Sequence, residues 1–149
     1  PPSDHDVDFF VREDDAERAL QALVDGGMEA ERPPEDWLLK ANDGDVTVDL
    51  IFRPAGGLVD DEQFARATDL EVDALRLPVA SIDDVLATKL LAITEQDPDF
   101  RHVLAIARAL REQIDWEELE ARSSISPFAR GFFAMVEALG IRPRAEALS

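Results

Sequence analysis

Apolar residues recur with two different periods along this chain of 149 residues, and the change near residue 80 limits the fold more than any other feature. Before it, short stretches alternate apolar and polar residues, as half-buried strands do. After it, apolar residues recur every three or four positions, as in amphipathic helices. The change predicts an α+β protein (mixed α/β), in which a small mixed sheet flanked by helices precedes a helical bundle. We expect an α/β core over residues 1–80 and a helical part over 81–149 that packs on it.

Local signals place the individual elements within each part. Strands are expected over residues 6–12, 28–31, 37–40, 46–53 and 70–79, and helices over about 14–25 and 60–67. Turn-forming residues at 42–45 predict that the third and fourth strands form a hairpin. Asp14 and Glu17 have the spacing of a capping box for the first helix. Four later helices are expected to begin at Ser81, Asp97-Pro98, Asp115 and Ser126-Pro127, which carry capping or first-turn residues.

The composition excludes several classes of protein. Acidic residues number 33 and basic residues 15, so the net charge is −18, which excludes a generally cationic surface for nucleic acid. Cysteine is absent, which rules out disulfides, thiolate nucleophiles and zinc-thiolate sites. No apolar run approaches the ~20 residues of a membrane span, and nothing resembles a signal peptide. We therefore expect a cytoplasmic protein that does not bind membranes.

Three aspartates lie in predicted strands. Asp6 and Asp8 are two residues apart, so their side chains point to the same face of the first strand. Asp49 lies in the middle of the strongest strand, flanked on its own face by Thr47 and Ile51. One interpretation is that these carboxylates belong to strand faces open to water. The other is that they bind a hard divalent cation, which prefers oxygen ligands and relieves the repulsion between carboxylates.

Two residues in the helical part also stand out. The chain has only two lysines, Lys40 and Lys89, and Lys89 falls in the apolar stripe of its helix. An ammonium group there either reaches an anionic partner in a cleft or packs its stem while the amine reaches water. Asp99 lies at the edge of the apolar face of the following helix. It is expected either to interact with the dipole of that helix or to pair with Lys89.

These residues together resemble the nucleotidyltransferase superfamily, which has the polymerase-beta-like fold. The family signature is an Asp-x-Asp strand, matched by Asp6 and Asp8, and a third Asp in a later strand, matched by Asp49. The stretch Leu86–Ala92, followed by Asp99, looks like the AbiEii-like toxin branch. The resemblance covers most of residues 5–112.

The resemblance implies Mg²⁺-dependent transfer of a nucleoside monophosphate from a nucleoside triphosphate to an acceptor hydroxyl, in a toxin–antitoxin type of system. It implies that Asp6 and Asp8 bind two Mg²⁺ ions, and that Asp49 completes one metal site and helps to activate the hydroxyl. Lys89 would contact phosphate and Asp99 would orient it. The acceptor would be RNA, protein or a small molecule. The acidic composition favours a small one, since a polyanion needs a basic patch, for which the candidates are Arg12, Arg18, Arg53 and Arg76.

The alternative function is non-catalytic. The family places a Gly-Ser or Gly-Gly turn upstream of the Asp pair, where backbone amides at a helix N-terminus hold the triphosphate. Only five residues precede Asp6 here, and none is glycine. If such a turn lies upstream, we expect catalysis. Without it, we expect a nucleotidyltransferase-like binding or regulatory module, antitoxin-like, whose acidic surface meets a basic protein partner.

Overall fold

The computed structural model describes residues 6–55, 57–72 and 74–144. The chain divides into two compact units, residues 1–65 and 66–149, which are described separately. Strands and helices occur together in the first unit, while helices dominate the second, so the expected α+β class is confirmed. The division falls after Ala65, so residues 66–80 belong with the helices. The packing of residues 81–149 on the core stays a prediction.

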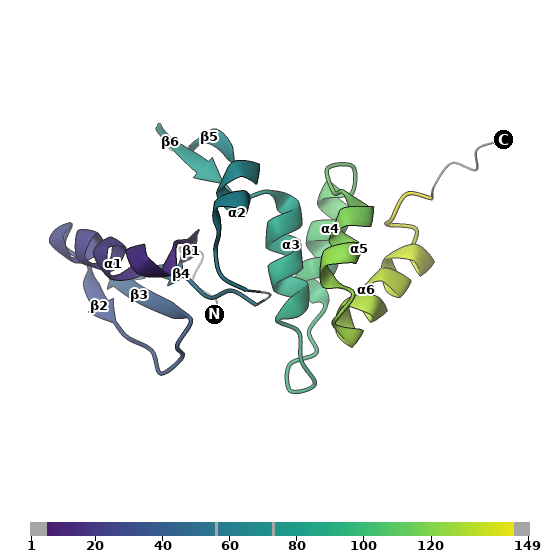
Figure 1. Ribbon diagram of the computed structural model, residues 1–149, viewed down its shortest axis with the longest axis horizontal. Coiled ribbons are helices and arrows are strands. Elements are labelled where there is room, and N and C mark those ends of the chain that lie inside the picture. Colours follow the sequence, from purple (N-terminus) through teal and green to yellow (C-terminus); the bar gives the residue numbers. More distant parts are fainter. Residues whose placement is uncertain (1–5, 56, 73, 145–149) are drawn as a thin grey trace. The chain divides into compact units, whose positions relative to one another are not determined.

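A four-stranded mixed sheet forms the centre of the first unit (Figure 1). Its strands follow the order β1 (Asp6–Phe10), β4 (Val46–Ile51), β3 (Leu38–Asp43) and β2 (Glu29–Glu31). β1 is parallel to β4, and the other neighbours are antiparallel. The predicted hairpin of β3 and β4 is confirmed, with Gly44 at φ +61° in its two-residue turn.

One face of this sheet is apolar, and α1 (Ala16–Asp25) packs on it over β2, β3 and β4 (Figure 1). Leu20 of this helix packs with Ala41, Val48 and Leu50 of the sheet. Because side chains alternate along a strand, the residues between these point to the opposite face. That opposite face carries the polar residues of the strands, including the three predicted aspartates.

The start of α1 differs from the prediction. A 3₁₀ turn, η1 (Glu13–Asp15), precedes the helix, so Asp15 takes the N-cap position and makes no side-chain cap. The predicted capping box of Asp14 and Glu17 is therefore wrong. Glu17 instead accepts hydrogen bonds from Arg32, a contact that sequence spacing does not indicate. A short helix, α2 (Asp61–Arg66), lies at the boundary between the units.

The second unit opens with a hairpin where a single strand was predicted. β5 (Thr68–Val72) and β6 (Leu75–Val79) pair antiparallel, with Leu70 opposite Leu77. Each arm alternates apolar and polar residues, so the sequence resembles one long strand. The reversal includes Ala74 at φ +65°, and alanine is not a residue that predicts a turn.

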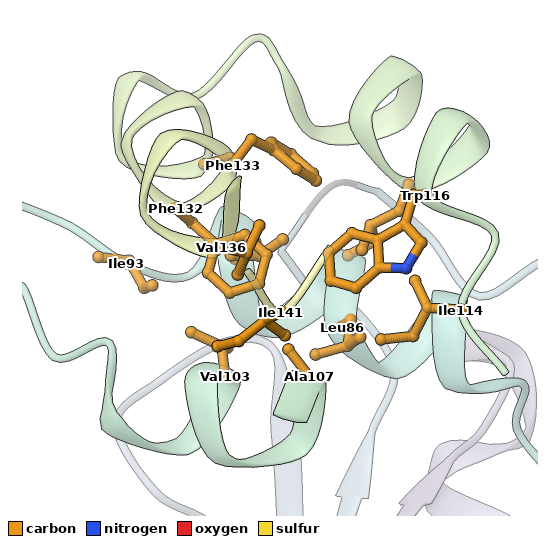
Figure 2. Close-up of a cluster of buried hydrophobic side chains, with 14 residues drawn as sticks. Leu86, Ile93, Val103, Ala107, Ile114, Trp116, Phe132, Phe133, Val136 and Ile141 are labelled. Atoms are coloured by element: carbon orange, nitrogen blue, oxygen red, sulfur yellow. The ribbon is translucent and has the colours of Figure 1, made fainter. Parts of the chain in front are cut away.

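Four helices complete the second unit: α3 (Ile82–Leu91), α4 (Arg101–Leu110), α5 (Trp116–Ser123) and α6 (Pro127–Ala138). Figure 2 shows their core, in which Phe132 and Val136 lie among side chains from the other helices. The N-caps Ser81, Asp115 and Ser126 are confirmed by hydrogen bonds from backbone N–H groups. α4 begins at Arg101 and not at Asp97-Pro98, because Thr94 and Asp97 bond to each other's backbone and delay the helix. Among the described residues, none of the helices has the length and apolar character that crossing a membrane requires.

A buried ionic network joins the start of this unit to its helices. The side chain of Asp84 is only 2 % exposed. Its oxygens accept two hydrogen bonds from the Arg66 guanidinium, one from Arg122 and one from the Ser81 hydroxyl. Burial alone would raise the pKa of Asp84, but these hydrogen bonds outweigh burial and lower the pKa to about 2.

Candidate functional site

Strand register brings the three predicted aspartates to one face of the first sheet. Asp8 of β1 and Asp49 of β4 are direct partners in the parallel pair. Partners in register point to the same side of a sheet, and Asp6 is two residues before Asp8. Asp6 and Asp8 are exposed and Asp49 is half-buried. The expected common face of Asp6 and Asp8 follows from this register, and Asp49 lies on that face as well. The convergence of all three carboxylates on one site stays a prediction.

Lys40 is the residue of this face that the sequence interpretation missed. It lies opposite Asp49 in the β3–β4 hairpin, and its Nζ donates a hydrogen bond of 2.7 Å to Asp49 Oδ1. Both side chains are about one-quarter exposed, at 27 % and 22 %. Partial burial would lower the pKa of Lys40, but the bond to Asp49 and the charges of Glu31 and Asp6 raise it above its ordinary value.

The hairpin turn contained the signal that could have identified Lys40. A two-residue turn at Gly44 and Asp45 pairs Asp43 with Val46. Counting outward three residues on each strand pairs Lys40 with Asp49. Once the turn length is assigned, the register follows from the sequence alone.

Neutral and acidic groups extend the polar face beyond Lys40. The hydroxyl of Thr47 donates to Asn42 Oδ1 at 3.0 Å, and Asn42 Nδ2 donates to Glu31 Oε2 at 2.8 Å. Glu31 is also the strand partner of Lys40. The face therefore holds several carboxylates around one ammonium group, which leaves a local excess of negative charge.

The chemistry of this donor set fits a hard divalent cation such as Mg²⁺, which takes carboxylate oxygens from neighbouring strands. Among the described residues, however, no three acidic or histidine side chains are grouped closely enough to hold one metal ion. Asp49 has an oxygen bonded to Lys40. His5, next to the Asp pair, lies outside the described residues.

The other two predicted site residues, Lys89 and Asp99, belong to the second unit. Lys89 of α3 is exposed, so its amine reaches water and does not lie buried in the apolar stripe. Asp99 accepts hydrogen bonds from the backbone and guanidinium of Arg101. These bonds hold the pKa of Asp99 well below its usual range. A Lys89–Asp99 ion pair is not found in the described part of the chain, and their roles toward a nucleotide stay predictions.

The arginines considered for a basic patch are largely engaged by the protein's own acids. Arg12 pairs with Asp61, and its guanidinium also lies 4.4 Å from the centroid of the Phe64 ring. Arg18 pairs with Asp15 at 2.7 Å. Arg53 pairs with Glu13 and Asp36. Together, these ion pairs leave little local excess of positive charge in the first unit.

In comparisons with known proteins, no protein-family model and no curated protein matches the sequence.

Proposed function

We propose that the chain carries the catalytic part of a Mg²⁺-dependent nucleotidyltransferase, which transfers a nucleoside monophosphate from a nucleoside triphosphate to an acceptor hydroxyl. The observation that supports this most is the register of β1 and β4, which sets Asp8 beside Asp49, with Asp6 on the same face. Three carboxylates on one face of neighbouring strands are a suitable oxygen donor set for divalent cations.

In this reaction the acceptor oxygen attacks the α-phosphorus, and the bond to the β-phosphate oxygen breaks. Pyrophosphate leaves with the bonding electrons, and the hydroxyl proton passes to a base or to water. Bound Mg²⁺ supplies stabilisation of the charge on the phosphates and a lowered pKa for the attacking oxygen. Asp6 and Asp8 would hold the ions on the triphosphate. Asp49, the strand partner of Asp8, would complete one metal site and help to activate the acceptor hydroxyl.

The charge of the first unit favours a small acceptor over RNA. The guanidinium groups of Arg12, Arg18 and Arg53 are paired with carboxylates of the same unit. A polyanionic acceptor would have to displace these pairs and overcome the net charge of −18. A neutral or cationic molecule that bears a hydroxyl group meets no such barrier.

The test uses the full chain with Mg²⁺ and each triphosphate, and it measures triphosphate binding by calorimetry and pyrophosphate release. Asp8→Asn and Asp49→Asn remove candidate ligands. Glu35→Gln removes an equal charge from the exposed loop between β2 and β3 and is the matched control. We expect Mg²⁺-dependent binding and release in the wild type and in Glu35→Gln, and loss of both in the Asp variants. Absence of triphosphate binding, or equal binding by wild type and Asp8→Asn, would refute the proposal.

A second candidate function is a non-catalytic module of the same fold that acts through protein contact. The observation that favours it is the Lys40–Asp49 ion pair, which neutralises a predicted site carboxylate within the protein itself. Under this function, Mg²⁺ with triphosphate leaves the thermal unfolding of the wild type unchanged. Replacing all three aspartates by asparagine would likewise leave a salt-sensitive complex with a basic protein intact.

A further inference from the structure

Lys40 lies among acidic side chains on the polar face of the sheet. It bonds to Asp49, it is the strand partner of Glu31, and the negative charge of Asp6 also acts on it. These three acids come from β4, β2 and β1, so the lysine lies amid carboxylates from three different strands. A single ammonium group therefore balances part of the charge of the whole face.

From this placement, we infer that Lys40 is a resident counter-ion that competes with a divalent cation for Asp49, and that it must release this carboxylate when the cation binds. The inference rests on the proposed function, because it takes the cation to be the one used in nucleotide transfer. Lys40 is a positioning residue here and not a catalytic one. In the absence of the cation, its bond holds Asp49 and lowers the repulsion within the face.

The competition follows from charge and from geometry. The 2.7 Å hydrogen bond engages Asp49 Oδ1, which is one of the two oxygens that the carboxylate offers to a cation. A positive charge that stays near Asp49 also repels an incoming divalent ion. At a separation of roughly 6 Å in a water-like dielectric, removing that charge tightens binding of a divalent ion by roughly tenfold.

The opposite role is a lysine that orients Asp49 for the metal, as partners of metal ligands commonly do. The two roles predict opposite effects of removing the charge. A competitor weakens cation binding, so its loss tightens binding, whereas an orienting partner strengthens binding, so its loss weakens it. The direction of the change therefore distinguishes them.

The wild-type protein allows a direct measurement, because Lys40 and Lys89 are its only lysines. Their side-chain Cε and Nζ resonances can be followed by NMR during a Mg²⁺ titration of the full chain. We expect the Lys40 resonances to shift saturably as the ammonium leaves Asp49. The Lys89 resonances are followed in the same titration, and a shift of equal size in both lysines would indicate a general salt effect and would refute the release of Asp49.

A second measurement compares Mn²⁺ binding, read by electron paramagnetic resonance, among four proteins. Lys40→Met keeps the length of the stem and removes the charge, and Lys40→Arg keeps the charge. We expect Lys40→Met to bind Mn²⁺ roughly tenfold more tightly than the wild type, and Lys40→Arg to bind within about twofold of the wild type. Adding Asp49→Asn to Lys40→Met should abolish the gain.

The outcomes separate this inference from the proposed function. If Mn²⁺ binds to the wild type and is lost in Asp8→Asn, but Lys40→Met binds no more tightly and the Lys40 resonances do not move, the competition is refuted and the metal site stands. Weaker binding by Lys40→Met overturns the inference in favour of an orienting role. If no variant binds Mn²⁺, both proposals fail. The NMR titration needs no substitution, so it decides the matter even if Lys40→Met does not fold.

Discussion

Replacement of Asp84 by asparagine is expected to destabilise the second unit strongly at neutral pH and hardly at all in acid. Asp84 is 2 % exposed and accepts hydrogen bonds from Arg66, Arg122 and Ser81. Asparagine has nearly the same shape but carries no charge. It would leave two guanidinium groups facing a neutral amide, whose nitrogen cannot accept a hydrogen bond.

The magnitude follows from the pKa of Asp84. Its folded-state pKa is about 2, compared with an ordinary value of 3.8. The difference is roughly two units, and each unit corresponds to about 1.4 kcal/mol, so the ionised form contributes about 2–3 kcal/mol to folding. Because the folded pKa is the lower one, this contribution is complete above pH 4 and is lost as the pH falls from about 4 towards 2.

The two tryptophans make the assay specific for one unit. Trp116 is buried in the second unit, and Trp37 is 40 % exposed in the first. In a Trp37→Phe background, the fluorescence of Trp116 reports urea unfolding of the second unit alone. The free energy of unfolding is then measured at several pH values between 2 and 7, with and without Asp84→Asn.

Two results would refute this reasoning. One is a loss below about 1 kcal/mol at pH 7, which is the usual size of an exposed ion pair. The other is a loss that stays constant between pH 7 and pH 2, since a protonated Asp84 should differ little from asparagine. Glu117→Gln removes an exposed carboxylate from the same unit and is the charge-matched control. It should change the free energy by only a few tenths of a kcal/mol.

Three further substitutions test packing, a turn and a cap, each by urea unfolding. Phe132→Ala removes a fully buried ring from the core in Figure 2 and should cost about 3–5 kcal/mol; a cost near 1 kcal/mol would mean that the ring is not packed as described. Gly44→Ala places a side chain at φ +61° and should cost about 1 kcal/mol in the first unit, whereas Gly44→Asn should cost less because asparagine tolerates this region; equal costs would contradict the strain argument. Ser126→Ala removes the acceptor for the Ala129 N–H and should cost about 1 kcal/mol, and Ser126→Asp should retain most of the stability.

Several local features could be predicted well from the sequence. The strand over 46–51 and the caps at Ser81, Asp115 and Ser126 follow from alternation and from hydrogen bonds that span three residues. The hairpin turn at Gly44 follows from the conformational freedom of glycine. The common face of Asp6 and Asp8 follows from the period of a strand.

The errors arose where a turn without turn residues, or a contact between residues two or three apart, sets the local conformation. The stretch 68–79 folds back at Ala74, although the alternation of each arm resembles one continuous strand. Thr94 bonds to Asp97 and delays the start of α4. Asp99 bonds to Arg101, whereas Lys89 was one of the two alternatives considered for it. In each case the sequence is compatible with both the predicted contact and the observed one, and the geometry of the folded chain selects between them.

Periodicity and capping act over a few residues, so the amino-acid sequence was enough to predict the α+β class, most element types and the common face of Asp6 and Asp8. The environments of Lys40 and Asp84 depend on pairing between separate segments. Strand register places the ammonium of Lys40 on Asp49, and residues 66 and 122 converge on a carboxylate at position 84. Such long-range pairs have no periodic signature, because they are selected by the free energy of the whole fold rather than by neighbouring residues.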